Sequence, residues 1–395
     1  MNQTLNYTTI DSFRIIASLL VIAIHTSPLS SFSAEADFFL TRVLARIAVP
    51  FFFMVTGFFT VFPLLAEKNK VLRRQIQNNY LKKTALLYGL SILIYLPLGL
   101  YAGHYQSLTP LHALRLLFFD GTFYHLWYFP ACLIGVLLIS FAGKHLSFPH
   151  MLTAAFFLYG FGLLGDSYYG LLPHSGILYK LYQHSFSLFS YTRNGIFFAP
   201  LFLLLGSFLR TSPKENTPEK VCLFPQSSIS CRNRDHHINI AGLIFSFALM
   251  TFEAFTLRHF ALQRHDSMYL FLIPTMIFLF RLLLQASASL PRHFSFAVLR
   301  TASTWIYILH PAAIVAVRAA AKLLSVSFII EQSFVHYLLV SVSSAACAWI
   351  IAIFGKKRRC IKKEQQLRQD VSSDFAQFPD HISQEKNGGN ENESI

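Results

Sequence analysis

Charged residues are scarce in this 395-residue chain: they make up 13% of it, about half of the roughly 25% that is usual in soluble domains. Tryptophan is rare, with three residues, and the five cysteines are an odd number. Cys132 and Cys347 lie within apolar runs, so the cysteines suggest no disulfide framework. The composition excludes a soluble globular enzyme, a disordered chain and a disulfide-stapled secreted domain.

Hydrophobic residues are abundant, at 54% of the chain, and 41 of them are phenylalanines. They come in long runs, and a membrane-spanning helix needs roughly 20 mostly apolar residues. The sequence therefore predicts an all-α fold, a polytopic transmembrane helical bundle of about ten spans. The runs lie near residues 13–26, 43–65, 80–101, 126–142, 151–164, 195–209, 238–257, 268–284, 302–324 and 335–354.

The net charge of +14 comes from basic residues that gather in the segments between these runs. Segments rich in Lys and Arg stay in the cytoplasm. We therefore expect a multi-pass protein of a bacterial plasma membrane with both termini cytoplasmic, and we expect no nucleic-acid partner. The basic residues concerned are Lys68, Lys70, Arg73, Arg74, Lys82 and Lys83, then Arg210, Lys214, Lys220, Arg232 and Arg234, then Lys356, Lys357, Arg358, Arg359, Lys362 and Lys363.

Two parts are predicted: a transmembrane domain over residues 1–355 and a polar, disordered cytoplasmic tail over residues 356–395. The first apolar run could be a signal peptide, because Ser33 and Ala34 resemble a cleavage site. We favour an uncleaved helix, since no basic residue precedes Arg14 and Asp11 is acidic.

The sequence lacks several common catalytic motifs of soluble enzymes. No phosphate-cradling glycine loop, nucleophile elbow or zinc-protease motif occurs. Cys222, Cys231, His236 and His237 share one polar segment, but they lack the close pairs typical of a zinc site. We predict no metal site and no bound cofactor.

Ionisable residues inside apolar runs are the main functional signal, because placing them at membrane depth costs about 2.5–3.5 kcal/mol at a helix centre. Arg14 and His25 are eleven residues apart, so they share one helix face at about 16 Å along its axis. His25 could exchange protons near neutral pH. The alternative is an Arg that snorkels to the surface and a packed, hydrogen-bonded His.

Two further ionisable residues, Glu253 and His310, stand within apolar runs. Glu253 needs a partner there, with Arg14, His25 and His310 as candidates, or it forms a structural hydrogen bond between helices. His310 precedes Pro311, which frees a carbonyl and suggests either a kink beside a cavity or a simple packing kink.

The sequence resembles the acyltransferase-3 family of membrane acyltransferases over about residues 8–355. Arg14 and His25 match the family's Arg-x10-His motif in the first helix. Within the family, the chain is similar to the membrane domain of the vancomycin-resistance serine racemases. Since a polar tail follows that domain here, we expect no racemase domain and no racemase activity. The matching stretches are residues 23–26, 46–54, 124–130, 165–167, 192–198, 265–270 and 309–311.

The resemblance implies transfer of an acyl group from a cytoplasmic donor, acyl-CoA as co-substrate, to a hydroxyl of an envelope or cell-wall acceptor outside. It implies that His25 is a general base, with Arg14 on donor phosphate or a developing oxyanion and Glu253 tuning His25. It also implies substrate contacts from His125, Trp127, Arg193, Asn194 and His310. Trp127 could instead be an interfacial anchor.

One family motif is altered. Where typical members have Arg-Arg-x-x-Arg before the third helix, this chain has Lys82, Lys83 and, at the third position, Leu86. Lys82 and Lys83 are the expected donor-binding residues, although Lys lacks the forked donor of Arg.

Two other functions are compatible with the sequence. The chain could be an L-serine permease that supports cell-wall precursor synthesis and glycopeptide resistance, with Arg14 and Glu253 binding the carboxylate and the ammonium group. It could also be a membrane scaffold for cell-wall enzymes. A separate racemase or cell-wall enzyme is an expected partner beside the lipid bilayer.

Overall fold

The computed structural model describes the backbone of residues 7–106, 108–210, 229–287 and 297–376, and side chains over 7–106, 108–210, 235–286 and 298–355. These residues form helices and connecting turns, with no strand among them. Most of the polar segment with Cys222 and Cys231, and the end of the predicted tail, lie outside the described residues.

Six helical segments are long and apolar enough to cross a membrane, which confirms an all-helical membrane protein. Four shorter apolar helices coincide with the remaining predicted runs, so the count of about ten spans stays a prediction. The six segments are Thr8–Thr26, Ala34–Ala66, Lys70–Tyr101, Asp235–His259, Val298–Leu323 and Ser333–Gly355. The shorter helices are Tyr128–Ala142, Phe148–Leu164, Ala199–Phe208 and Leu272–Ala286.

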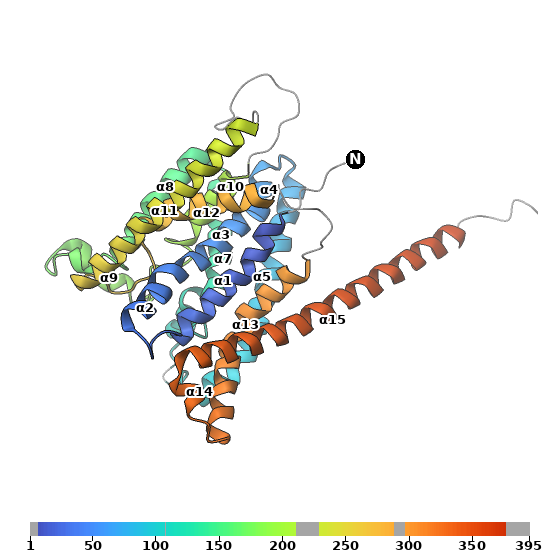
Figure 1. The fold of residues 1–395 in the computed structure, drawn as a ribbon. Coiled ribbons are helices and arrows are strands. Elements are labelled where there is room, and N and C mark those ends of the chain that lie inside the picture. The colour runs from blue at the N-terminus through green and yellow to red at the C-terminus, as the bar shows by residue number, and fades with distance from the viewer. Residues whose placement is uncertain (1–6, 107, 211–228, 288–296, 377–395) are drawn as a thin grey trace, which may run out of the picture.

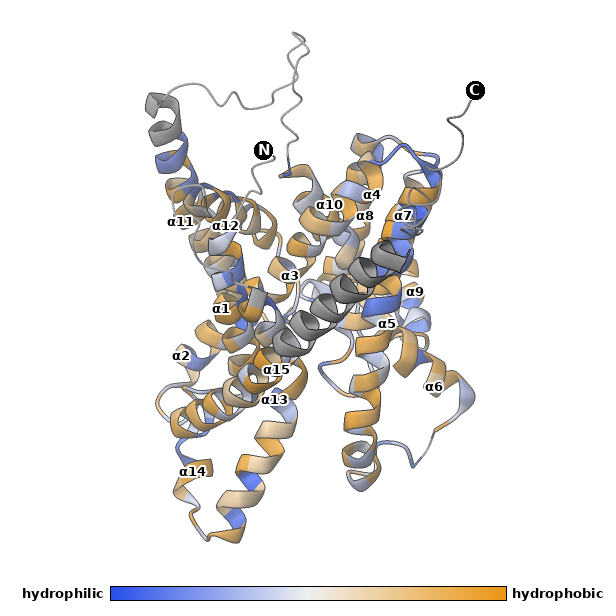
Figure 2. Ribbon diagram, turned by 90° about the vertical axis from the view of Figure 1, so that its right-hand side faces the viewer, coloured by the Kyte–Doolittle hydropathy of each residue, from blue (hydrophilic) through white to orange (hydrophobic). Residues whose placement is uncertain are grey.

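The helices form one bundle in which α1 lies centrally, against α3, α12, α13 and α15 (Figure 1). Figure 2 shows hydrophobic residues along most of the bundle's helices and hydrophilic residues gathered where α4, α5 and α7 meet. The main elements are α1 (Thr8–Thr26), α5 (Lys70–Tyr101), α7 (Tyr128–Ala142), α8 (Phe148–Leu164), α10 (Ala199–Phe208), α11 (Ile229–His259), α12 (Leu272–Ser287), α13 (Ala297–Leu323) and α15 (Ser333–Ala376). Short helices are α6 (Pro110–Arg115), α9 (Ile177–Ser185) and α14 (Phe328–Glu331).

The second long segment, predicted as one span, is a helical run with changes of pitch. It consists of α2 (Ala34–Phe38), a π-helix, a short 3-10 turn, α3 (Ala48–Thr56), a second π-helix over Gly57–Val61, and α4 (Phe62–Ala66). Such π-helical turns are rare and often occur at functional sites.

Two glycines allow this run to cross α10 at backbone contact. A Cβ atom on Gly57 would lie 2.0 Å from the carbonyl oxygen of Leu203, and one on Gly206 would lie 2.0 Å from that of Met54. Small residues permit such close approach between membrane helices. The crossing holds α10, and therefore the loop that precedes it, against α3.

Candidate functional site

Three imidazole rings meet at the C-terminal end of α1. The ring of His25 stacks on that of His310 at a centroid distance of 5.3 Å, and the ring of His125 lies 5.2 Å from His310. Tyr124 packs 4.7 Å from His25. We call His25, His125 and His310 the histidine cluster. Thus the structure brings together three of the predicted site residues, which come from α1, α13 and the turn before α7.

His25 differs from its two neighbours in accessibility. It is half-buried, whereas His125 and His310 are buried. No hydrogen bond joins its ring nitrogens to a described residue. The imidazole of His25 is therefore available to a ligand.

A proline inside α13 frees a backbone carbonyl that orients His310. Pro311 has no N–H, so the carbonyl of Tyr307 lacks its helical partner, and Nδ1 of His310 lies 2.8 Å from that oxygen. Because a carbonyl only accepts, Nδ1 carries the proton and Nε2 is an acceptor. One residue further, the Tyr95 hydroxyl donates to the carbonyl of Ile308 at 2.5 Å.

Arg14 lies in a different place, on the wall of a cavity of about 160 Å³ nearer the N-terminus of α1. We call this the Arg14 cavity. Its lining is rich in hydroxyl groups and comes from α1, α3, α5, α7 and α13: Phe52, Val55, Thr56, Tyr80, Thr84, Leu87, Tyr128, Phe129, Cys132, Ser303, Thr304 and Tyr307. Tyr307 also packs 6.1 Å from the ring of His310, so its ring lies between this cavity and the histidine cluster.

The charge of Arg14 is already paired. Its Nε lies 3.2 Å from a carboxylate oxygen of Asp11, and Arg300 contacts the other oxygen at 3.0 Å. Asp11 is buried, and its carboxylate is compensated by the two cations Arg14 and Arg300. Arg14 is thus held in place, with part of its surface on the cavity.

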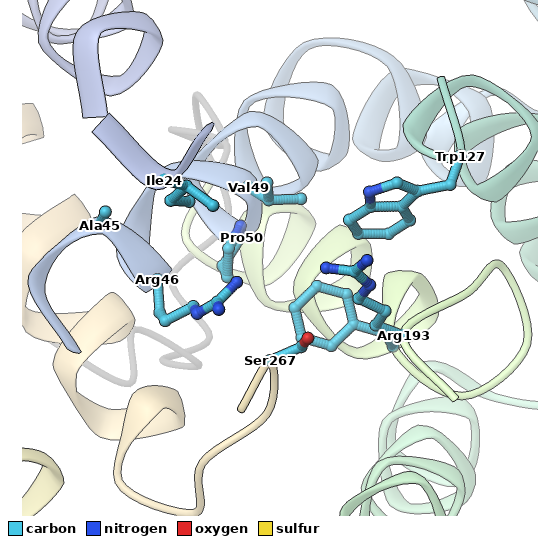
Figure 3. A pocket seen from close by; sticks show the side chains of 9 residues that line it. Ile24, Ala45, Arg46, Val49, Pro50, Trp127, Arg193 and Ser267 are labelled. Atoms are coloured by element: carbon cyan, nitrogen blue, oxygen red, sulfur yellow. The ribbon is translucent and has the colours of Figure 1, made fainter. Parts of the chain in front are cut away.

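A second, smaller pocket of about 20 Å³ lies on the His25 side of the bundle. We call it the Arg193 pocket, and Figure 3 shows Arg193 and Arg46 reaching toward the same space beside Trp127. Ile24, next to His25 in the chain, lines it too. The remaining lining residues are Ala45, Val49, Pro50, Phe198 and Ser267.

Arg193 is held by aromatic rings. The centre of its guanidinium lies 5.0 Å from the ring centroid of Trp127 and 4.3 Å from that of Tyr191, which are cation–π contacts. Its Nε is buried, and no described residue offers the guanidinium a hydrogen bond or an ion pair. Burial first, and the neighbouring charge of Arg46 second, lower the pKa of Arg193.

Two aspartates lie in the loops around this pocket. Asp266 pairs with Arg46 and, at 3.2 Å, with Arg42. Burial acts to raise the pKa of Asp266, but the arginines, Arg46 foremost, outweigh it and lower that pKa below its usual value. Asp166 is fully buried and accepts the backbone N–H groups of Ser267 and Met268 at 2.7 and 3.1 Å.

Glu253 has partners other than the predicted ones. Its carboxylate accepts the backbone N–H groups of Leu270 and Phe271, at 2.6 and 3.0 Å, and the Tyr168 hydroxyl at 2.7 Å. These bonds fix the chain just before α12 begins. No contact joins Glu253 to Arg14, His25 or His310 among the described residues, so the position matches the structural alternative.

Asn194 shapes the loop that carries Arg193. Its side-chain oxygen accepts the N–H groups of Ile196 and Phe197 at 2.9 and 3.1 Å, and its amide nitrogen donates to the carbonyl of Tyr191. Both polar atoms are therefore engaged within the loop. The geometry suggests that Asn194 positions Arg193.

Lys82 and Lys83 lie on the exposed face of α5. Lys82 lines an open hollow of about 570 Å³ with Lys70 and Arg74. The buried face of the same helix carries Tyr80 and Thr84 to the Arg14 cavity. The two expected donor-binding lysines thus lie near that cavity but point away from it.

Sequence reasoning did not single out Arg46, Asp11, Asp266 or Tyr307. A signal existed for Arg46, because it is an arginine within the second predicted span. No residue type identifies Tyr307 as the side chain between the Arg14 cavity and the histidine cluster, since that position depends on the packing of α13 against its neighbours.

A family model, described as an acyltransferase domain of the acyltransferase-3 type, matches residues 7–353. The chain belongs to the acyltransferase-3 family. It is 37% identical over 363 residues to an amino-acid racemase of Enterococcus faecalis, covering 89% of this chain and 46% of the relative. It is 37% identical over 334 residues to a serine/alanine racemase of Enterococcus gallinarum, covering 84% and 44%.

The acyltransferase-3 chain therefore spans about half the length of the curated relatives it matches. These matches confirm the resemblance drawn from the sequence motifs. No solved structure matches.

Proposed function

We propose that this acyltransferase-3 protein transfers an acyl group from a cytoplasmic acyl-CoA to a hydroxyl of an envelope acceptor on the opposite side of a bacterial cell membrane. The observation that carries the proposal is the half-buried His25, whose ring nitrogens bond to no described residue although the rings of His310 and Tyr124 pack against it. A general base must be accessible to the proton that it removes.

His25 takes the proton of the acceptor hydroxyl as that oxygen attacks the thioester carbonyl. The new ester C–O bond forms, the C–S bond breaks, and the proton passes to the departing thiolate. His310 is a positioning residue in this scheme. Its Nδ1 proton is held by the Tyr307 carbonyl, so its ring offers a fixed surface on which His25 stacks.

The Arg14 cavity supports an approach of the donor from the end of the bundle where α5 begins. Its volume of about 160 Å³ exceeds by roughly tenfold the 10–15 Å³ that one water needs. Lys70, Arg74 and Lys82 lie in the open hollow on α5 and offer positive charge to the phosphates of a coenzyme.

The distance between Arg14 and His25 assigns them separate tasks. Eleven residues of α-helix span about 16 Å along the axis. Arg14 therefore contacts the donor within its own cavity, and it does not stabilise an oxyanion next to His25. The excess of Lys and Arg in the segments near α5 supports a cytoplasmic position for that end of the bundle.

L-serine uptake is the second candidate, and the racemase names of the relatives favour it. The charges predicted to bind the zwitterion do not share a cavity, however. Arg14 is paired with Asp11, and Glu253 holds the start of α12. Acyl transfer is therefore the function that the geometry supports better.

The test uses the full chain in lipid vesicles, with radiolabelled acetyl-CoA outside and a membrane-impermeant sugar acceptor inside. The protein is inserted so that its basic loops face the acetyl-CoA. Loss of one general base lowers the rate by about 10²–10⁴-fold, and we expect this for His25→Ala. His174→Ala, at an exposed loop histidine, is the matched control. Labelled serine accumulation without any acyl transfer would favour the permease.

A further inference from the structure

Arg193 forms no ion pair within 4 Å with any described residue, although it lines the Arg193 pocket. Most buried charges in proteins are paired, because an unpaired one lacks the solvation it had in water. The close contacts of Arg193 are the faces of Trp127 and Tyr191, and Asp166 and Asp266 act on it only at longer range. Such a cation is prepared for an anion that arrives from outside the protein.

The neighbouring aspartates do not supply that anion. Asp266 is bound to Arg46 and Arg42. Asp166 directs one oxygen to the N–H groups of Ser267 and Met268, and it forms no ion pair with Arg193. Arg42, Arg46 and Arg193, with Arg264 near Asp166, therefore outnumber the two aspartates around the pocket. The surplus positive charge favours binding of an anion.

The size and lining of the pocket indicate which anion fits. A volume of about 20 Å³ exceeds the 10–15 Å³ for a single water, which suits a small planar group. The guanidinium of Arg193 lies against aromatic rings, which leaves its edge for in-plane donation (Figure 3). A planar guanidinium edge matches a carboxylate in a two-point contact.

We infer that the Arg193 pocket binds a carboxylate carried by the acyl acceptor, and so makes this protein selective for an acidic acceptor. The identity of the ligand as an acyl acceptor rests on the proposed function, whereas the carboxylate site itself does not. Ile24 lines the pocket beside His25, so an acceptor anchored there by its carboxylate presents a nearby hydroxyl to that imidazole. Arg46 and Arg193 would recognise the acceptor, while Arg14 serves the donor.

Trp127 provides a direct reporter of binding, because its ring contacts Arg193. Trp305→Phe and Trp349→Phe together leave Trp127 as the one tryptophan of the chain. The purified full chain in detergent is titrated with sodium propionate at constant ionic strength, and Trp127 fluorescence is recorded. We expect a saturable change with propionate and none with propionamide, which has the same shape without the charge.

Arg193→Gln should weaken propionate binding at least about tenfold, since a charge-assisted contact contributes about 1.5–3 kcal/mol. Arg193→Lys, which keeps the charge but not the fork, should lie between this variant and wild type. Arg258→Gln is the matched control, since Arg258 pairs with Glu35 at the surface. Size-exclusion chromatography of each variant verifies that the fold is retained.

Three results would overturn the inference: no saturable change with propionate in the wild type, equal binding by Arg193→Gln, or equal binding of sulfate. Glucuronate and L-serine then distinguish the source of the carboxylate. Stronger binding of glucuronate supports an acidic glycan acceptor, and stronger binding of serine contradicts it. Because the readout is binding, propionate binding without any acyl transfer would refute the proposed function and leave the carboxylate site standing.

Discussion

An arginine lies near each end of α1, and the two arginines differ in whether a carboxylate pairs with them. Near the N-terminus, Arg14 borders a cavity of about 160 Å³ and is paired with Asp11. Near the C-terminus, beyond His25, Arg193 borders a pocket of about 20 Å³ and has no ion-pair partner among the described residues. One arginine is neutralised by the protein, and the other is left for a ligand.

The Arg14 cavity is therefore the larger of the two sites, and the Arg193 pocket is the one with an unpaired positive charge. A paired cation beside a hydroxyl-lined cavity suits a large ligand that brings little net charge to that point. An unpaired cation in a small pocket suits a small anion. Under the proposed function, the body of the donor and the acceptor would bind at the two ends of one helix. The thioester would then have to pass the ring of Tyr307 to reach His25.

Tyr307→Ala is the change expected to have the largest effect on this division. The tyrosine is buried, and its ring packs on Tyr128, His125 and His310. Its loss should lower the free energy of unfolding by about 3–5 kcal/mol, as for other large aromatic residues in cores. It should also join the Arg14 cavity to the histidine cluster, which raises hydrolysis of acyl-CoA by water.

Thermal unfolding in detergent and release of free CoA measure the two effects. Tyr101→Ala is the control, because Tyr101 is 94% exposed at the end of α5. An unchanged ratio of hydrolysis to transfer in Tyr307→Ala would show that this ring does not separate the compartments.

Asp11→Asn tests the pairing itself, with a smaller expected effect. It leaves Arg14 and Arg300 without their shared carboxylate, and breaking a buried pair costs about 3–5 kcal/mol. Arg300 is about half exposed, so we expect about 2–3 kcal/mol here. Adding Arg14→Gln should restore part of the stability, because it removes the uncompensated charge.

The matched control is Glu35→Gln, which breaks the exposed pair with Arg258. Surface pairs contribute about 0–1 kcal/mol. Chemical unfolding followed by circular dichroism measures all four proteins. Equal losses for Asp11→Asn and Glu35→Gln would mean that Arg14 does not depend on its carboxylate partner.

The sequence was sufficient to predict much of the fold. Long apolar runs predicted a helical membrane protein, and six segments have the required length and composition. Motif order predicted the family, because Arg14, His25 and the residues around Arg193 and His310 are matched over most of the chain. Hydropathy does not encode local pitch, so the π-helical turns between Ala34 and Ala66 were missed.

The site was predicted only in part. Helical periodicity predicted that Arg14 and His25 share one helix face, but a shared face is not a shared cavity when the Cα atoms are about 16 Å apart along the axis. Glu253 looked like a functional carboxylate because it stands in an apolar run. Its real partners are backbone N–H groups of the chain before α12, which sequence patterns cannot locate.

The smallest expected effect is a pH response confined to the loops around the Arg193 pocket. Burial raises the pKa of Asp166 to about 6, so this carboxyl binds its proton more tightly when folded than when unfolded, and its contribution to stability falls as pH rises from about 4 to 6. Burial, helped by Arg264, lowers the pKa of His265 to about 4, so its contribution rises over a similar window.

The two contributions have opposite signs, and in the wild type they should nearly cancel between pH 4 and 6.5. Asp166→Asn removes one of them, so its stability relative to wild type should fall on acidification. The expected difference is on the order of 2 kcal/mol between pH 6.5 and pH 4, because only the Asp166 pKa shift of about two units distinguishes the two proteins. Adding His265→Gln should flatten the profile again. Melting temperatures measured across this pH range test the prediction. Parallel profiles for the wild type and Asp166→Asn would mean that Asp166 does not titrate there. The surplus positive charge near Arg193 would then be constant with pH.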